Sequence, residues 1–132
     1  MTRLSVFALS FLGLMSVGTV AAAPVQLAGL NRLEHGAWEV RARGASANVQ
    51  QLCVGDPRQL LQPQHLGNSC SRYIVADGAN EITVTYNCQA AGSGRTDLRI
   101  ETPRLVQIQS QGVANRAPFS VSLEARRIGN CS

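Results

Sequence analysis

The chain has 132 residues, of which 15% are charged, and its formal net charge is +4 at pH 7. This length is enough for one domain with its own hydrophobic core. The charge is modest because the 12 basic residues are offset by 8 acidic ones. Such a balance argues against the clustered basic surface of a nucleic-acid-binding protein.

Residues 1–22 have the pattern of a secretory signal peptide. Arg3 precedes an apolar segment, residues 4–20, and three consecutive alanines follow it. A positive residue, an apolar core and a small-residue cleavage site are typical of a cleaved export signal. An apolar segment of this length is at the short limit for a membrane span, so a retained anchor is disfavoured. We expect cleavage after Ala22, a periplasmic or secreted location, and no transmembrane segment in the mature chain.

Residues 23–35 are expected to form an N-terminal lead-in before a single β-rich domain at residues 36–132. Leu27, Leu30 and Leu33 recur every three residues, which favours a short helical turn that packs on the domain. An extended linker is the alternative for this segment.

The domain itself shows the two-residue periodicity of β-strands. Its clearest example is the segment 82–88, in which Ile82, Val84 and Tyr86 alternate with polar residues. Side chains on a strand alternate between its two faces, so one face of this segment is apolar. Similar patterns predict further strands at residues 37–43, 49–54, 70–76, 95–101, 104–110 and 119–126, with a longer connection at residues 111–118.

A short helix is predicted at residues 56–62, between the second and third strands. Asp56 can cap its free amide groups, Pro57 suits its first position, and Pro63 ends it. With turn signals between the strands, the whole pattern predicts a mainly β fold. We expect an antiparallel meander that curls into a sandwich or partial barrel. Three aromatic residues on the apolar strand faces are its expected core anchors: Trp38, Tyr86 and Phe119.

All four cysteines lie in the expected mature chain, and an even number in a small exported protein predicts two disulfides. No C-x-x-C pair or histidine spacing indicates a metal site, and no cofactor is expected. Of the three possible pairings, Cys53–Cys70 with Cys88–Cys131 is favoured. The rival map pairs Cys70 with Cys88, which would turn Arg72 toward the apolar face at a cost if the arginine is unpaired.

Several short motifs occur in order between Gly36 and Cys131. They are Gly36-x-Trp38-Glu39, Cys53 before the short helix, Cys70 and Cys88 around a hairpin, and Arg127-x-Gly129-x-Cys131. This order resembles the bacterial exported domain-of-unknown-function family 3617. The resemblance implies a β-rich periplasmic protein with four such cysteines. The family has no established catalytic residues, so the resemblance implies none here.

The expected mature chain contains two histidines, His35 and His65, and neither lies in a recognisable frame with a serine or an acid. A hydrolase needs a nucleophile, a base and an orienting group in one pocket. Both histidines are therefore interpreted as solvated polar residues. We expect no enzyme activity and no catalytic residue, and a small hydrolase remains the weakest alternative.

The function expected instead is that of a binding or structural module of the bacterial envelope. Its partner is unknown and could be a periplasmic protein or an anionic component, a lipid phosphate or an acidic glycan. Arginine suits such anions because its planar fork donates two hydrogen bonds. Acidic residues interleave with these arginines, so ion pairs on a solvated sheet are the competing interpretation. The candidate anion-binding residues on the polar strand faces are Arg41, Arg43, Arg95, Arg99 and Arg126.

A carrier of a small apolar ligand inside the curled sheet is the other alternative. Small barrels are often filled by their own side chains. The alternative therefore depends on whether a sizeable apolar pocket opens on the inner side of the sheet.

Overall fold

The computed structural model describes residues 18–19, 27–44 and 49–132. The signal peptide predicted at residues 1–22 lies almost entirely outside this part of the chain and stays a prediction. No helix in the described part is long and apolar enough to cross a membrane.

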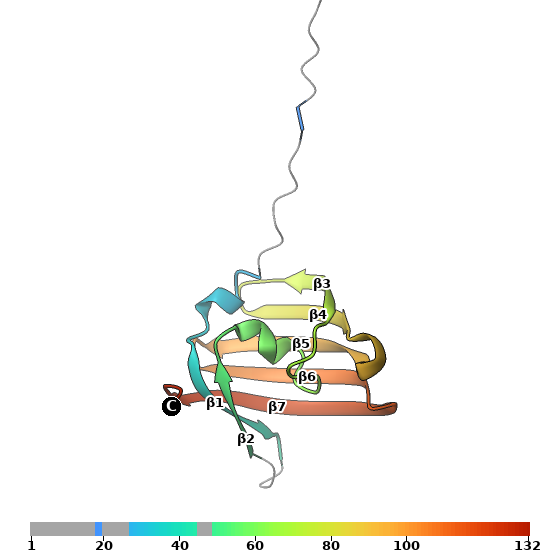
Figure 1. The fold of residues 1–132 in the computed structure, drawn as a ribbon. Coiled ribbons are helices and arrows are strands. Elements are labelled where there is room, and N and C mark those ends of the chain that lie inside the picture. Colours follow the sequence, from blue (N-terminus) through green and yellow to red (C-terminus); the bar gives the residue numbers. More distant parts are fainter. Residues whose placement is uncertain (1–17, 20–26, 45–48) are drawn as a thin grey trace, which may run out of the picture.

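Seven strands form a single antiparallel sheet in the order β2-β1-β7-β6-β5-β4-β3 (Figure 1). Every neighbouring pair is antiparallel, and the sheet does not close into a barrel. The predicted mainly β, antiparallel fold is therefore confirmed. The strands are β1 (Gly36–Ala42), β2 (Val49–Val54), β3 (Ser71–Asp77), β4 (Glu81–Asn87), β5 (Gly92–Thr102), β6 (Leu105–Ala114) and β7 (Ala117–Gly129).

The two faces of the sheet have opposite compositions. Trp38, Val84 and Val106 point to the inner face and have no exposed surface, whereas the residues between them on the strands are mostly polar and exposed. This follows from the alternation of side chains along each strand. Most of the hydrophobic core consequently lies on the inner face, and the outer face meets water.

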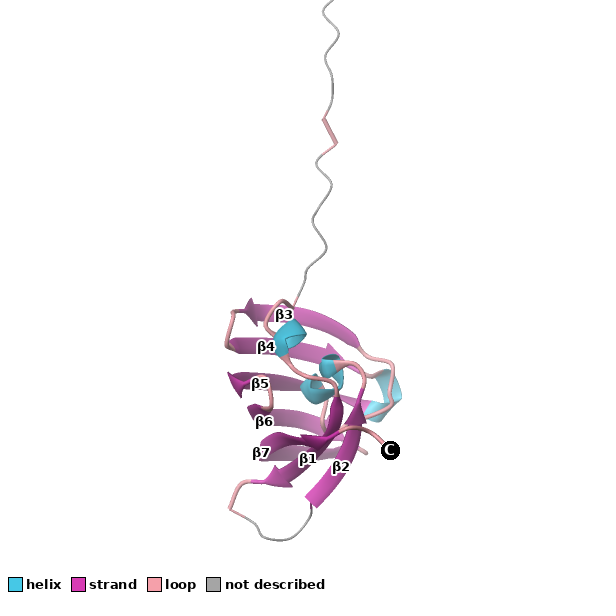
Figure 2. Cartoon of the chain, turned by 90° about the vertical axis from the view of Figure 1, so that its left-hand side faces the viewer, coloured by secondary structure: helices cyan, strands magenta, loops and turns pink. Residues whose placement is uncertain are grey.

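The connection from β2 to β3 crosses the inner face from one edge of the sheet to the other. The strands from β3 to β7 follow one another as neighbours, but β1 pairs with β7 and β2 lies outside β1. Residues 55–70 must therefore span the sheet, and they contain the short helix η2 (Pro57–Leu61). Figure 1 shows η2, in green, and the loop after it in front of the middle strands, and Figure 2 shows the helices on the side of the sheet toward which β1 and β2 curl. We call residues 55–70 the crossover.

The long connection predicted at residues 111–118 is wrong. β6 and β7 continue to Ala114 and Ala117 and are joined by Asn115 and Arg116 alone. Both residues have positive φ, 51° and 65°. This is the geometry of a type I′ turn, whose twist matches that of a hairpin.

The lead-in and the core anchors mostly behave as the sequence predicts. Leu30 and Leu33 are buried around the 3₁₀ helix η1 (Leu30–Arg32), which confirms the short helical turn. Trp38 and Tyr86 are buried in the core. Phe119 lies on the inner face of β7, but it is only half-buried, near the end of the sheet beyond β1.

Candidate functional site: the crossover and the groove beside it

The crossover starts with the helix that the sequence predicts, in 3₁₀ form. The Asp56 carboxylate accepts a hydrogen bond from the Arg58 amide at 3.0 Å, and Pro57 occupies the first helical position. Both features satisfy or avoid free amide groups at a helix start. Leu60 and Leu61, which follow, are fully buried against the sheet. Their burial holds the crossover down on the inner face.

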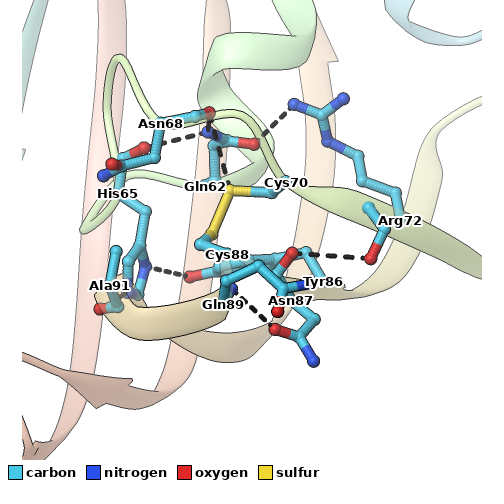
Figure 3. Close-up of a disulfide and its surroundings, with 11 residues drawn as sticks. Gln62, His65, Asn68, Cys70, Arg72, Tyr86, Asn87, Cys88, Gln89 and Ala91 are labelled. Carbon is cyan, nitrogen blue, oxygen red and sulfur yellow. Dashed lines mark hydrogen bonds between the residues drawn. A yellow bond between two sulfur atoms is a disulfide. The ribbon is translucent and has the colours of Figure 1, made fainter.

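Gln62 organises the loop that follows this helix (Figure 3). Its side chain is buried, and its Nε2 donates to the carbonyl oxygens of His65 and Asn68, both at 2.9 Å. Its Oε1 accepts a hydrogen bond from Arg72 Nη2 at 2.5 Å. A buried amide is stable only when its polar atoms find partners. Here one side chain fastens two turns of the loop to strand β3.

His65 is buried, so its interpretation as a solvated residue is wrong. Only 2% of its surface is exposed. Its Nε2 lies 3.0 Å from the Ala91 carbonyl oxygen and its Nδ1 lies 3.1 Å from the Tyr86 hydroxyl. A carbonyl can only accept, so Nε2 donates to Ala91, and Nδ1 shares a hydrogen bond with the Tyr86 hydroxyl. The ring also packs against Tyr86 and Phe119.

Glycines make room for this histidine and its tyrosine. Gly92 has φ +120°, and a Cβ there would lie 2.9 Å from His65 Nε2 and closer still to the Val113 carbonyl oxygen. A Cβ on Gly94 would lie 2.5 Å from the Tyr86 hydroxyl. Real Cβ atoms essentially never come so close. The absence of side chains at these two positions therefore lets the aromatic rings lie directly on strand β5.

The disulfides are Cys53–Cys131 and Cys70–Cys88, so the favoured pairing is wrong and the rival link Cys70–Cys88 is present. Cys53 and Cys70 stand at opposite edges of the sheet because β1 and β2 pair beyond β7. Each disulfide instead fixes one end of the crossover: Cys53 to the tail after β7, and Cys70 to the end of β4. Figure 3 shows the second link beside Gln62 and His65.

Arg72 has a hydrogen-bond partner, Gln62, which the pairing of Cys70 with Cys88 requires. Arg72 is placed opposite Tyr86 on the inner face of edge strand β3, and its guanidinium donates to Gln62 in the crossover. Burial lowers the pKa of Arg72, the nearby charge of Arg58 lowers it further, and Asp56 opposes both. Arg72 is hydrogen-bonded to Gln62 and lies on an edge strand of the sheet. The Cys70–Cys88 pairing therefore does not bury an unpaired arginine, which was the argument against it.

An apolar groove lies beside the crossover on the inner face. It has a volume of about 380 Å³ and lies between the crossover and the inner faces of β1, β2, β6 and β7. Leu52, Leu66 and Val121 in its lining are half-buried, and Val49 at its edge is 48% exposed. The inner side of the sheet therefore holds an apolar pocket that its own side chains do not fill.

The polar groups of the groove are uncharged. Gln50, Gln59 and Gln64 are exposed and line it from β2, η2 and the loop after η2. Of the residues that the structure describes, those that line the groove include no Asp, Glu, Arg, Lys or His. Amide groups can both donate and accept hydrogen bonds. The groove thus combines an apolar floor with neutral hydrogen-bonding groups at its margin, which is the common composition of small-molecule sites.

The candidate anion-binding arginines are on the outer face, as predicted, and four of them face acids two residues away. Arg99 Nη2 lies 2.8 Å from Glu101 Oε1, and Arg95 Nη2 lies 3.4 Å from Asp97 Oδ1. The other two pairs are Arg41–Glu39 and Arg126–Glu124. Arg43 and Asp97 both line a hollow of this face. The arrangement favours ion pairs on a solvated sheet over one shared anion site.

The histidines do not come together in a catalytic frame. His35 is exposed at the start of β1, and Arg127 Nε donates to its carbonyl oxygen at 2.7 Å. His65 uses both ring nitrogens in the buried cluster described above. Within the described residues, no group of three or more His, Cys, Asp or Glu could hold a metal ion.

Sequence reasoning missed Gln62 and His65, the two residues that fix the loop. Their partners outside the loop are Arg72 on β3, Tyr86 on β4 and Ala91 in the 3₁₀ helix η3 (Gln89–Ala91). These contacts depend on how those elements lie under the crossover. The only local signal was the apolar Leu66 beside His65, which indicates that the loop touches the core. The groove could be predicted only in part, because the strand predicted at residues 119–126 supplies Val121 and Leu123 to its lining.

Comparison with known proteins returns no match to a family model, a curated protein or a solved structure. The resemblance to family 3617 therefore stays a prediction, and the function rests on the geometry of the site.

Proposed function

We propose that this chain is an exported binding module of the bacterial envelope that carries the apolar part of a small ligand in the groove beside the crossover. The observation that carries this proposal is the groove itself, about 380 Å³ of apolar space on the inner face of an open sheet. Its size lies toward the lower end of the range for small-molecule sites. The ligand is therefore expected to be small, or to place only one chain in the groove.

The free energy of binding would come from the half-buried lining. Leu52, Leu66 and Val121 keep apolar surface in contact with water in the free protein. Covering such surface contributes roughly 25 cal/mol per Å². Val49, which is 48% exposed at the edge of the groove, would be covered as well.

The margin of the groove restricts the chemistry of the ligand. Three exposed glutamines can hydrogen-bond to a polar end, but no charged residue is present in the lining to pair with an ion. Burying an unpaired charge is costly. The ligand that fits is an alkyl or prenyl chain with an uncharged hydrogen-bonding end, such as an alcohol, ester or amide.

The burial and the hydrogen bonds of His65 are the reason for proposing binding without catalysis. A general base must lie within hydrogen-bond reach of the substrate proton that it removes. Both ring nitrogens of His65 are engaged, one with Tyr86 and one with the Ala91 carbonyl, and the ring is buried. Its role in this proposal is to hold the crossover, which forms one wall of the groove.

The test is the binding of a fluorescent apolar probe, N-phenyl-1-naphthylamine, followed by displacement with a long-chain alcohol. The variant Val49→Glu places a charge at the edge of the groove and should abolish the fluorescence increase. Val75→Glu is the matched control, because Val75 is 47% exposed on β3, away from the groove. No probe binding by the unmodified protein, or equal loss in both variants, would overturn the proposal.

A further inference from the structure

The outer face contains a second hollow, at the end of the sheet where β3, β4 and β5 meet β6 and β7. It has a volume of about 740 Å³ and is lined by residues from all five strands. Neighbouring strands lie about 4.8 Å apart, so the hollow crosses roughly 19 Å of sheet. Small outward side chains such as Thr85 and Ser93 lie between the longer ones of Tyr73, Arg95 and Gln111. We call this hollow the outer trough.

The outer trough differs in charge from the rest of the outer face. Among the described residues, its lining contains no aspartate or glutamate, and Arg95 is its outward-facing cation; Arg72 also lines it, but from the inner face of β3, where its guanidinium donates to Gln62. Arg95 is held only loosely by Asp97, because the 3.4 Å contact is exposed and Asp97 Oδ1 also accepts a 2.6 Å hydrogen bond from Thr83. Exposed pairs of this kind contribute little to stability. Arg95 is therefore able to exchange its carboxylate for that of a ligand, and its charge complements an anion.

The other lining groups are suited to a chain of hydroxyls. Among the described residues, the side chains of Thr85, Ser93 and Gln111 make no hydrogen bond within the protein. Hydroxyl and amide groups each donate and accept, as sugar hydroxyls do. The Tyr73 ring, 73% exposed beside them, offers a flat apolar surface with a polar end. A sugar ring presents the same combination, with C–H groups on its face and hydroxyls at its edge.

We propose that the outer trough binds a strand of an acidic, carboxylate-bearing polysaccharide. Arg95 would pair with a carboxylate, Tyr73 would stack on a sugar ring, and Ser93, Thr85 and Gln111 would hydrogen-bond to hydroxyls. A guanidinium and a carboxylate form the strongest of these contacts because both partners are charged. The proposal is independent of the groove, since the two sites lie on opposite faces of the sheet.

The test measures binding of an oligogalacturonate to the disulfide-bonded protein by calorimetry at low salt. Its methyl ester, which has the same sugars without the charge, should bind about tenfold more weakly. Poly-L-glutamate, an acidic peptide, should bind more weakly than the oligogalacturonate as well. Added salt should weaken the interaction with the acidic sugar, because exposed charges are screened.

Variants then locate the site. Arg95→Gln should weaken oligogalacturonate binding about tenfold, and Tyr73→Ala about fivefold. Arg126→Gln removes the same charge from the outer face away from the trough and should change the affinity by less than about twofold. Val49→Glu, in the groove, should leave it unchanged, which separates this proposal from the proposed function. No binding, equal affinity for poly-L-glutamate, or an Arg126→Gln effect as large as that of Arg95→Gln would overturn the proposal.

Discussion

On the inner face of the sheet side chains are held by burial, whereas on the outer face they pair with one another in water. Trp38 and Leu61 have no exposed surface, and the polar side chains of Gln62 and His65 are buried with partners for their polar atoms. The outer arginines form exposed ion pairs along their own strands, and such pairs contribute roughly 0.2–1 kcal/mol each. The inner face therefore supplies most of the stability, and substitutions on the outer face are expected to change the stability little.

The same difference separates the two proposed sites. The groove is built from residues that also hold the core, because Leu60 and Leu123 are buried beneath it. The side chains proposed to bind in the outer trough, such as Tyr73 and Arg95, are exposed, so their loss leaves the core intact. Substitutions in the groove are thus expected to affect both ligand binding and stability. Substitutions in the outer trough are expected to affect ligand binding alone. The following predictions measure that contrast.

The largest effect is expected at Trp38. Its indole is fully buried, and Nε1 donates to the Glu34 carbonyl oxygen at 2.9 Å. Trp38→Ala should lower the free energy of unfolding by about 4 kcal/mol, measured by urea denaturation. Tyr73→Ala on the outer face is the control and should change it by less than about 0.5 kcal/mol. Comparable losses in both variants would contradict the contrast between the faces.

Removal of the inner disulfide is expected to have the next largest effect. Cys70→Ala with Cys88→Ala opens a loop of 18 residues, which should cost about 3 kcal/mol by the chain-entropy model. Thermal unfolding of the double variant measures it. The pairing itself can be checked by tryptic digestion without reduction, since the four cysteines fall in the peptides 44–58, 59–72, 73–95 and 128–132. A peptide 44–58 linked to 59–72 would contradict the map.

Most strands, and which of their side chains point inward, were predictable from the sequence. The reason is that the alternation of apolar and polar residues is a local property of each strand. The sequence alternation of β4 and β7 matches their burial, with Val84 and Leu123 inward. The prediction failed at the β6–β7 hairpin, where Gly112 and Pro118 indicated a loop. Pro118 lies where β7 extends beyond β1, so one side of the strand has no neighbour, a setting in which proline is tolerated.

The disulfides and the buried cluster were not predictable, because they depend on strand order. That β1 pairs with β7 places Cys53 and Cys70 at opposite edges, and no local pattern encodes this. The order also forces the crossover over the inner face, where His65 meets Tyr86. Loop composition alone indicated a solvated histidine.

Gln62 tests whether the buried polar contacts hold the crossover. Gln62→Ala removes the hydrogen bonds from its Nε2 to two carbonyl oxygens and the one that Arg72 donates to it, which should cost about 2 kcal/mol. Hydrogen exchange should show faster opening of residues 62–70 in particular. Gln109→Ala, the same change at an exposed position of the outer face, should cost less than about 0.5 kcal/mol. If the two variants unfold at the same urea concentration, Gln62 does not organise the loop.

Tyr86 should make stability fall at alkaline pH. Burial raises the pKa of Tyr86, and a hydrogen bond with Ser110 opposes this rise to a smaller extent. Its contribution is therefore complete below the unfolded pKa of about 10 and is lost as the pH rises through the folded pKa. Tyr86→Phe loses the hydrogen bond to His65, which should cost about 1 kcal/mol at neutral pH. The variant should also lose less stability than the parent above pH 10, and parallel pH profiles would contradict this assignment.

The smallest effect is expected from an ion pair on the protein surface, between Glu34 and Arg104. The hydrogen bond from Arg104 Nε, 2.9 Å long, is the main cause that lowers the pKa of Glu34, and the charge of Arg127 contributes less. A carboxylate with a lowered pKa stabilises the fold above its unfolded pKa of about 4.3, and this contribution is lost as the pH falls through the folded pKa. Glu34→Gln should therefore lower the melting temperature slightly at pH 7, and the difference from the parent should vanish in acid. Arg104→Gln should behave alike, and adding Glu34→Gln to it should have little further effect, because the pair acts as one unit. A difference that persists in acid would show that Glu34 acts through packing, and the exposed pair would then contribute nothing measurable.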